Sequence, residues 1–281
     1  MSDSIQKRRV SKEIISVLKD HSPVTLEMMQ RMIEPPIQKK NIRQALGNLR
    51  QKGMVDMVTS GAHVFFYQLN QSLSGRNAAA TKIQSGKPIA PRPLLRRQDW
   101  FHNEWCEFWS LLIKRAFPNA EIIRDFDIES HETAKNILLQ NRGDYDLLPD
   151  FLVIFPKTDQ HERVSLAFEI ERTRKSNARI LTKLKKYIYE SHVDGLIYVC
   201  DSGRMSETIR QLYEKKVLEK AHKKRGYADH FFLFSDSMSA GDSPLLSFYN
   251  AKSESTSMIE WIQKLRSTKL TLRRDAFFKD A

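Results

Sequence analysis

Cysteine is scarce in this sequence: only Cys106 and Cys200 occur, each among apolar neighbours. Two isolated thiols support neither a disulfide framework nor a cysteine zinc site, so we expect both to be core residues. No apolar run approaches the roughly 20 residues needed to cross a bilayer, and the polar, basic start lacks the apolar segment of a signal peptide. We therefore expect a cytoplasmic protein without membrane insertion.

Acidic residues are scarce in the N-terminal third. Residues 1–97 hold 17 Lys and Arg against 6 Asp and Glu, whereas residues 98–281 hold 29 against 28. Nearly all of the formal net charge of +12 is therefore N-terminal. This excess favours a polyanionic partner, because Lys and Arg gain affinity for phosphates by releasing condensed counterions.

Residues 1–70 have the pattern of a small helical module. Apolar spacing predicts three helices, over about 11–18, 26–33 and 38–52. Thr25 can cap the second helix and Gly53 can close the third. Residues 54–60 and 63–69 flank Gly61 in the manner of two strands joined by a tight turn. Three short helices followed by a hairpin predict a winged helix-turn-helix domain.

The third predicted helix carries side chains suited to DNA. In a winged helix-turn-helix this helix enters the major groove. Asn41, Arg43 and Gln44 can read base edges, and the other cations can hold phosphates. The DNA-binding set is Lys39, Lys40, Asn41, Arg43, Gln44, Arg50 and Lys52. A solvated helix face, or a winged helix that contacts protein, would have the same composition.

The pattern changes after residue 70. Residues 71–97 are rich in Ser, Gly, Ala and Pro and carry several arginines, which predicts a basic flexible linker. From about residue 99 an aromatic-rich helix is followed by alternating strands and helices. The expected elements are strands over 121–127, 151–155 and 164–171, a helix over 176–192, a strand over 195–200, a helix over 206–220 and a strand over 230–234. This order predicts an α/β domain over 98–250, with a helix over 257–267 and a basic tail within 251–281.

Three carboxylates stand at the ends of two apolar strands. Asp150 precedes the first strand, and Glu169 and Glu171 end the second. Successive side chains of a strand alternate between faces, so Glu169 and Glu171 project to the same side. Neighbouring anions beside a core need a cation, and a hard divalent ion with oxygen ligands is one solution. The other is a solvated strand end whose acids pair with Arg172, Arg174 or Lys175.

This order of elements and acids, over about residues 99–235, resembles the restriction-endonuclease-like nucleases. Their signature is Pro-Asp, a gap, and then Asp or Glu, any residue and Lys. Here Pro149-Asp150 is followed, after eighteen residues, by Glu169-Ile170-Glu171, so Glu171 stands where the signature has Lys. Some type II restriction enzymes of this fold also carry Glu there. Lys175 could supply a displaced ammonium or contact a phosphate.

A narrower resemblance is to the MOBC family of plasmid mobilisation relaxases. It is carried by the basic helix-rich N-terminus, His102-Asn103-Glu104, Asp150, the segment Glu169-Ile170-Glu171 followed by Arg172-Thr173-Arg174-Lys175, and a Tyr-bearing helix. The resemblance implies a nuclease-fold relaxase that nicks double-stranded plasmid DNA at a transfer origin and so starts conjugative mobilisation. Its implied partners are an accessory relaxosome protein and a coupling protein.

The implied chemistry is metal-dependent phosphodiester cleavage. Asp150, Glu169 and the carbonyl of Ile170 would hold Mg²⁺ or Mn²⁺. Glu171 would accept the proton of the attacking water or hold a second ion. Glu104 could reach the same cluster from the first helix of the α/β domain.

Two further side chains are open to interpretation. His102 lies about 200° around the helix from Glu104, which favours a structural or DNA-contact role over catalysis. Tyr187 could hold a cut 5′ phosphate covalently, or it could pack in the core. Two other functions stay open: a restriction or transposon endonuclease of the same fold, and a non-catalytic plasmid regulator that binds DNA.

Overall fold

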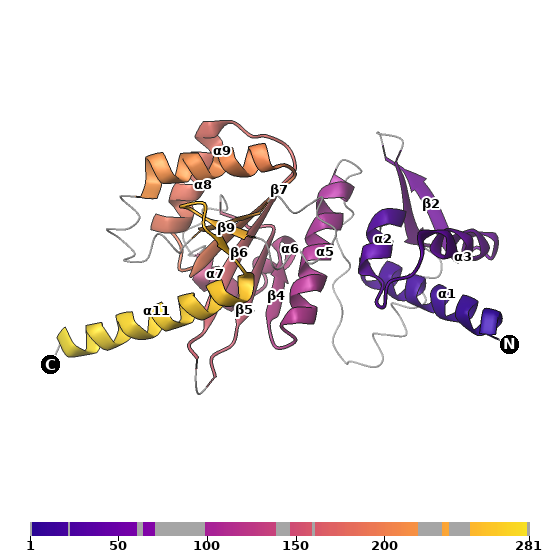
Figure 1. Cartoon of the computed structure of the whole chain (residues 1–281), viewed down its shortest axis with the longest axis horizontal. Helices are drawn as coiled ribbons and strands as arrows, with labels where there is room; N and C mark the ends of the chain where they lie inside the picture. The colour runs from indigo at the N-terminus through magenta and orange to yellow at the C-terminus, as the bar shows by residue number, and fades with distance from the viewer. Residues whose placement is uncertain are drawn as a thin grey trace. The chain divides into compact units, whose positions relative to one another are not determined.

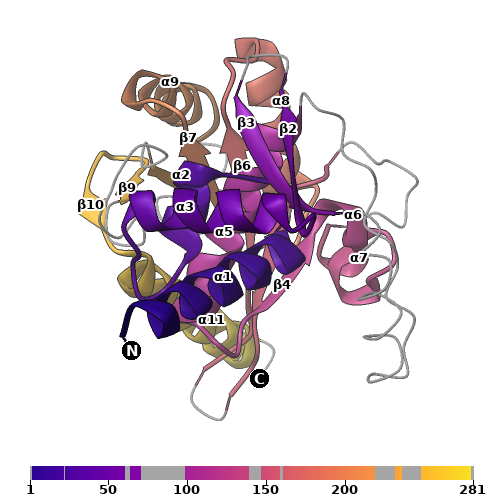
Figure 2. The same ribbon diagram turned by 90° about the vertical axis from the view of Figure 1, so that its right-hand side faces the viewer.

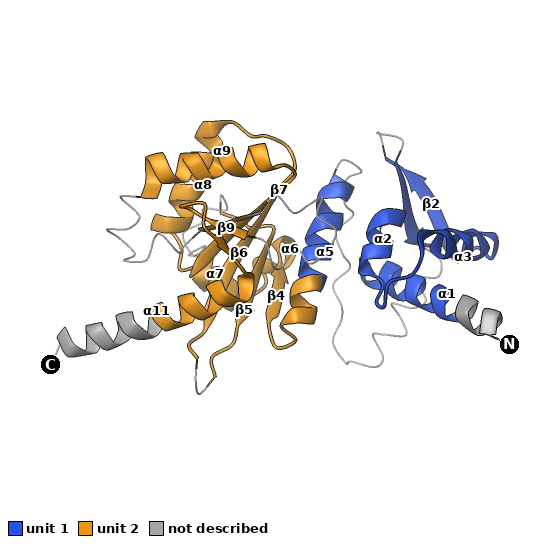
Figure 3. Cartoon of the chain, in the orientation of Figure 1, with its two compact units in different colours: residues 1–111 blue, residues 112–281 orange. Residues whose placement is uncertain are grey.

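The computed structural model describes residues 2–21, 23–60, 64–70, 99–138, 147–158, 161–218, 232–235 and 248–279. The chain divides into two compact units, residues 1–111 and 112–281 (Figure 3). The division falls inside helix α5 (Trp100–Ala116), whereas the sequence places a boundary near residue 98. The predicted linker over 71–97 lies outside the described residues.

The first unit contains the three helices and the hairpin that the sequence predicts. Its elements are α1 (Ser2–His21), β1 (Val24–Thr25), α2 (Leu26–Met32), α3 (Lys39–Gln51), β2 (Val55–Thr59) and β3 (Phe65–Leu69). Strand β1 was not predicted; it pairs with β3, which also pairs with β2, and both pairings are antiparallel. Fully buried apolar residues, among them Ile14, Met29, Ile42 and Phe66, form the core between the helices and this sheet.

The predicted caps of α2 and α3 are confirmed. The Thr25 hydroxyl accepts the N–H of Met28 at 3.2 Å. Gly53 has φ of 65°, and the chain closes α3 through N–H groups of Gly53 and Met54, which donate to the carbonyls of Arg50 and Leu49. This double hydrogen bond satisfies the last carbonyls of the helix, and it needs a left-handed residue that glycine supplies without strain.

The start of α5 packs within the first unit. The Phe66 ring contacts Trp100 and Phe101 at centroid distances of 5.3 and 4.8 Å. The Arg31 guanidinium lies 5.6 Å from the Trp105 ring. These aromatic contacts explain why residues 100–111 belong with the N-terminal module, although the sequence assigns the whole helix to the α/β domain.

The second unit is built on a mixed seven-stranded sheet with the order β10-β9-β8-β7-β6-β5-β4 (Figure 1). Its strands are β4 (Glu121–Arg124), β5 (Phe151–Phe155), β6 (Val164–Glu171), β7 (Gly195–Cys200), β8 (Phe232–Ser235), β9 (Phe248–Asn250) and β10 (Ser255–Thr256). Strands β6, β7 and β8 are parallel, and the pairs on either side of them are antiparallel. Every residue of β5, β6 and β7 is buried, so this is the centre of the core.

Helices cover both faces of this sheet. Helices α8 (Asn177–Tyr189) and α9 (Gly203–Tyr213) lie on one face, and α11 (Met258–Lys279) lies on the other (Figures 1 and 2). Trp261 of α11 fits against Gly195, where a Cβ would stand 2.4 Å from the indole. The short helices α6 (Asp125–Ile128) and α7 (Glu132–Leu138) follow β4.

Predicted boundaries were wrong at four elements. Helix α1 begins at Ser2, although the apolar spacing predicted its start near residue 11. The strand expected over 121–127 ends at Arg124, because Asp125 and Asp127 begin α6, and acids favour the first turn of a helix. The helix expected over 206–220 begins at Gly203 and continues into a π-helix, η3 (Glu214–Leu218). The expected basic tail is helical, since α11 extends to Lys279.

The two cysteines and the lengths of the apolar helices can be read directly from the structure. Cys106 and Cys200 are buried and form no disulfide, which confirms that both are core thiols. Among the described residues, no helix combines the length and the apolar character that crossing a bilayer requires.

Candidate active site

The two acidic segments identified in the sequence meet where β5 begins and β6 ends. Phe151 of β5 pairs with Phe168 of β6, so the antiparallel register brings Asp150 to Glu169. The Ile170 N–H donates to Asp150 Oδ2 at 2.5 Å, and the Asp150 N–H donates to the Phe168 carbonyl at 3.0 Å. The carboxylate of Asp150 therefore continues the strand ladder and is held next to Glu169.

Glu169 and Glu171 project toward the face of the sheet that α8 covers. They pair with Tyr198 and Cys200 of β7, which belong to the apolar cluster on that face. Only 2 % of Glu169 and 4 % of Glu171 are exposed. Burying an unpaired carboxylate costs several kcal/mol, so both side chains require partners in the interior.

Helix α8 supplies the partners of Glu169. The Lys183 ammonium lies 2.6 Å from Glu169 Oε2 and also donates to the Leu148 carbonyl at 3.3 Å. The Tyr187 hydroxyl donates to Glu169 Oε1. Ser176 fixes the start of this helix, because its hydroxyl accepts the Arg179 N–H at 3.3 Å.

The pKa values of Glu169 and Lys183 are both raised, for different reasons. Burial raises the pKa of Glu169, and the Asp150 carboxylate raises it further, against the lowering effect of Lys183. Burial acts to lower the pKa of Lys183, but the attraction of Glu169, Asp150 and Glu171 outweighs it and raises that pKa. Glu169 therefore holds its proton more strongly chiefly because it is buried, whereas Lys183 does so because the surrounding carboxylates attract its charge.

Glu171 has a lysine of its own. Lys175 lies 2.9 Å from Glu171 Oε2, and 31 % of the lysine side chain is exposed. Lys175 was predicted to act as a displaced catalytic ammonium, to contact a phosphate, or to pair with the strand-end acids, and the structure shows the ion pair. Lys175 lies at the edge of the cluster, as an ion-pair partner of Glu171. Lys183, on α8, reaches Glu169 instead.

The sequence interpretation missed Lys183 as a site residue. A signal was present, because Lys183 interrupts the apolar stripe formed by Ile180, Leu184 and Tyr187, all of which are buried. A lone cation at helical spacing within such a stripe has to find an anion inside the protein.

The backbone of Ile170 lies on the same edge of β6 as Asp150. The N–H and carbonyl of one strand residue point to the same neighbour, as in the paired residues of an antiparallel ladder. Because the β5–β6 pairing begins at Phe151 and Phe168, Ile170 extends past the end of β5. Its carbonyl, a predicted metal ligand, therefore points toward the side where Asp150 stands.

Tyr187 has a clear structural environment. Its side chain is fully buried, and burial together with the Glu169 charge holds the pKa of its hydroxyl well above the usual value. A phenol in this state is a poor nucleophile, because it is not ionised near neutral pH. In the described structure Tyr187 orients Glu169.

Glu104 and His102 belong to the first unit. Glu104 is buried on α5, and its Oε1 accepts the backbone N–H of Thr25 at 2.5 Å. This contact holds the start of α2, where the Thr25 hydroxyl caps the helix. His102 is half-buried on the same helix.

The predicted DNA-binding side chains of α3 share its solvent face to different degrees. Lys40, Arg43, Gln44, Arg50 and Lys52 are exposed, whereas Lys39 and Asn41 are half-buried. Lys39 lies 2.6 Å from Glu27 of α2, and its hydrogen bond and charge lower the pKa of that carboxyl. The opposite face of α3 carries Ile42, Ala45, Leu46 and Leu49, which are buried.

Asp150, Glu169 and the Ile170 carbonyl are oxygen donors, which is the ligand type that Mg²⁺ and Mn²⁺ prefer. In the structure both oxygens of Glu169 are bonded within the protein, to Lys183 and Tyr187. Comparisons with protein-family models, curated proteins and solved structures returned no match, so this site has to be interpreted from its own geometry.

Proposed function

We propose that this chain is a metal-dependent DNA endonuclease that nicks plasmid DNA at a transfer origin, as a relaxase with a nuclease-type active site. One observation carries the proposal: Asp150 and Glu169, from neighbouring strands, share a buried cluster with the ammonium of Lys183. This combination supplies the carboxylates and the lysine that the Pro-Asp signature calls for, with the lysine on a helix instead of the strand.

The metal would be held by three oxygen donors. These are the carboxylates of Asp150 and Glu169 and the carbonyl of Ile170. Bound there, Mg²⁺ or Mn²⁺ would acidify a water and offset charge on the phosphoryl oxygens. Tyr187 supports the site indirectly, because its hydrogen bond fixes the Glu169 carboxylate.

The remaining side chains would handle protons and charge. Lys183 would stabilise negative charge that develops on the phosphoryl group, because its ammonium is held beside Glu169. Glu171 would accept the proton of the attacking water once Lys175 moves toward the DNA. We assign Glu104 a structural role, because its carboxylate holds the start of α2.

The first unit would deliver DNA to this site. We propose that it is a winged helix-turn-helix domain whose α3 enters the major groove, because the exposed face of α3 carries cations and amides above a buried apolar face. A transfer-origin nickase would act in the cytoplasm, with an accessory relaxosome protein and a coupling protein as further partners.

Plasmid nicking tests the proposal. Supercoiled plasmid is incubated with the protein and Mn²⁺ or Mg²⁺, and open circles are separated from linear DNA on a gel. The wild type should form open circles only, whereas Asp150→Asn and Glu169→Gln should cut at least about a hundredfold more slowly.

A matched control separates chemistry from folding. Asp194 is also a buried carboxylate on this sheet, and it accepts the N–H and hydroxyl of Ser165 at the other end of β6. Asp194→Asn should lose stability but keep cleavage per folded molecule. Full activity in Asp150→Asn would refute the proposed mechanism, and linear product would favour a restriction or transposon endonuclease.

A second candidate is a non-catalytic plasmid regulator that binds DNA. It is favoured by the ion pairs of Glu169 with Lys183 and of Glu171 with Lys175, since a purely structural cluster would have the same pairs. Metal-independent DNA binding, without cleavage under any metal, would support this candidate and overturn the enzyme.

A further inference from the structure

An unusual run of cations follows Glu171. Residues 172–189 contain seven Lys and Arg and no Asp or Glu, although residues 98–281 as a whole are nearly neutral, with 29 cations against 28 acids. The run begins at the end of β6 and continues along α8. It therefore starts beside the acidic cluster of the second unit.

The cations of this run have two different environments. Lys175 and Lys183 turn toward Glu171 and Glu169. Arg174 and Arg179 are exposed, and neither forms an ion pair with any residue that the structure describes. Arg179 precedes Lys183 by four residues, so both lie on one face of α8, with Arg179 a turn closer to the start of the helix.

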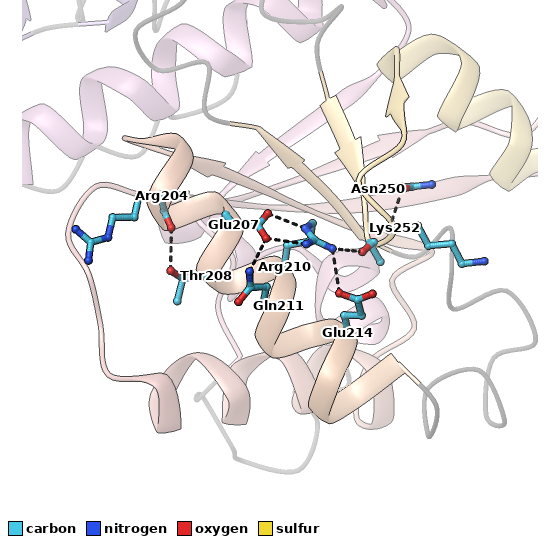
Figure 4. A network of polar contacts seen from close by, with 9 residues as sticks. Arg204, Glu207, Thr208, Arg210, Gln211, Glu214, Asn250 and Lys252 are labelled. Carbon is cyan, nitrogen blue, oxygen red and sulfur yellow. Dashed lines mark hydrogen bonds and ion pairs between the residues drawn. The ribbon is translucent and has the colours of Figure 1, made fainter.

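A third exposed arginine, Arg204, follows the neighbouring strand β7. Glu171 pairs with Cys200 in the parallel register, and the Asp201 N–H donates to the Glu171 carbonyl at 3.0 Å. Arg204 follows shortly after, in the first turn of α9. Its guanidinium extends away from the Glu207–Arg210 network, and only its backbone carbonyl is bonded there, to Thr208 (Figure 4).

We infer that Arg174, Arg179 and Arg204 form an arginine rim that binds the phosphate backbone of the DNA strand on either side of the phosphate to be cut. The inference rests on the proposed function. Buried carboxylates at the end of β6 repel a polyanion, so the strand has to be held by cations outside the cluster. Arginine suits this role, because its planar fork donates two hydrogen bonds to one phosphate.

The salt dependence of DNA binding tests the arginine rim. One variant carries Arg174→Gln, Arg179→Gln and Arg204→Gln. The control carries Lys157→Gln, Lys216→Gln and Lys264→Gln, which remove the same charge from exposed positions elsewhere in the second unit. Binding of a labelled DNA duplex is measured in EDTA over a series of salt concentrations.

The rim variant should lower the slope of log affinity against log salt by about 2 to 3, because each lost phosphate contact removes about 0.9. The control should leave the slope unchanged. An equal decrease of the slope in both variants would show that only net charge matters, and it would overturn the inference. An unchanged slope in the rim variant would also overturn it. A version with three Arg→Lys substitutions keeps the charge and should keep the slope.

This test is separable from the proposed function. Binding in EDTA involves neither cleavage nor a metal ion. Full plasmid nicking by Asp150→Asn together with a lowered slope in the rim variant would refute the mechanism and leave the rim as a DNA-binding surface. Loss of nicking in Asp150→Asn together with an unchanged slope in the rim variant would support the mechanism and refute the arginine rim.

Discussion

Both units bury carboxylates, but they compensate them in different ways. In the first unit Glu104 accepts a backbone N–H from Thr25, and Glu107 lies 2.9 Å from the His21 ring. In the second unit the acids face the ammonium groups of Lys183 and Lys175. A backbone N–H is fixed by the fold and cannot leave the carboxylate that it binds. A lysine side chain is flexible, so it can move away from the carboxylate and a second cation can take its place.

Under the proposed function, this difference would separate structural acids in the first unit from chemical ones in the second. The acids of the first unit join α5 to the segments around it, at His21 and Thr25. The acids of the second unit meet at one end of the sheet, where strand β6 stops. Substitutions in the two sets should therefore have different consequences.

The largest effect is expected for Lys183→Met. Removing one partner of a buried pair leaves the Glu169 charge uncompensated and should cost about 3–5 kcal/mol of unfolding free energy. Added Mn²⁺ should restore more stability in this variant than in the wild type, because the ion replaces the lost ammonium. Thermal unfolding with and without Mn²⁺ measures both effects.

The control for this experiment is Lys185→Met, an exposed position on the same helix. It should change stability by less than about 0.5 kcal/mol, with no added response to Mn²⁺. Equal melting curves for the two variants would show that the Lys183 ammonium does not compensate the buried charge of Glu169.

Glu104→Ala should have the next largest effect, in the first unit. It leaves the Thr25 N–H without its carboxylate and should cost about 1–3 kcal/mol. Mn²⁺ affinity, measured by calorimetry, should stay at the wild-type value. A lost Mn²⁺ site in Glu104→Ala would assign this acid to the metal cluster and remove the contrast between the two units. Asp20→Ala, at an exposed position, is the stability control.

Two glycines sharpen the contrast between surface and interior. A Cβ on Gly47, on the exposed face of α3, would have nothing within 4 Å, so Gly47→Ala should stabilise the helix by about 0.5–1 kcal/mol. The same substitution should weaken duplex binding if α3 approaches DNA closely there. Gly195→Ala would clash with Trp261 and should destabilise by about 1–3 kcal/mol. Chemical unfolding and a binding titration measure these changes.

The smallest effect concerns the surface network on α9 (Figure 4). Hydrogen bonds from Arg210 and Gln211 lower the pKa of Glu207 from 4.5 to about 2. A lowered pKa stabilises the fold above pH 4.5 and loses that contribution as pH falls toward 2. Glu207→Gln should therefore cost less than about 1 kcal/mol at neutral pH, because the group is solvent-screened, and nothing below pH 2. A pH series of unfolding curves that shows the opposite trend would contradict this.

The sequence predicted the central strands well, because β5, β6 and β7 are continuous apolar runs of strand length bounded by polar residues. It placed Asp150, Glu169 and Glu171 at strand ends for the same reason. It missed Lys183, because the contact with Glu169 spans 14 residues and depends on how α8 packs on the sheet. It also missed α6, where two acids in a first helical turn outweigh the apolar pattern of the preceding strand.

The proposal that Asp150 and Glu169 hold a divalent cation can be measured without knowing the DNA site. Calorimetric titration of Mn²⁺ into the full-length wild type and into Asp150→Asn tests it most directly. We predict saturable binding by the wild type and at least about a tenfold loss of affinity in the variant. Equal Mn²⁺ affinity in the two proteins, or no binding by either, would contradict the account.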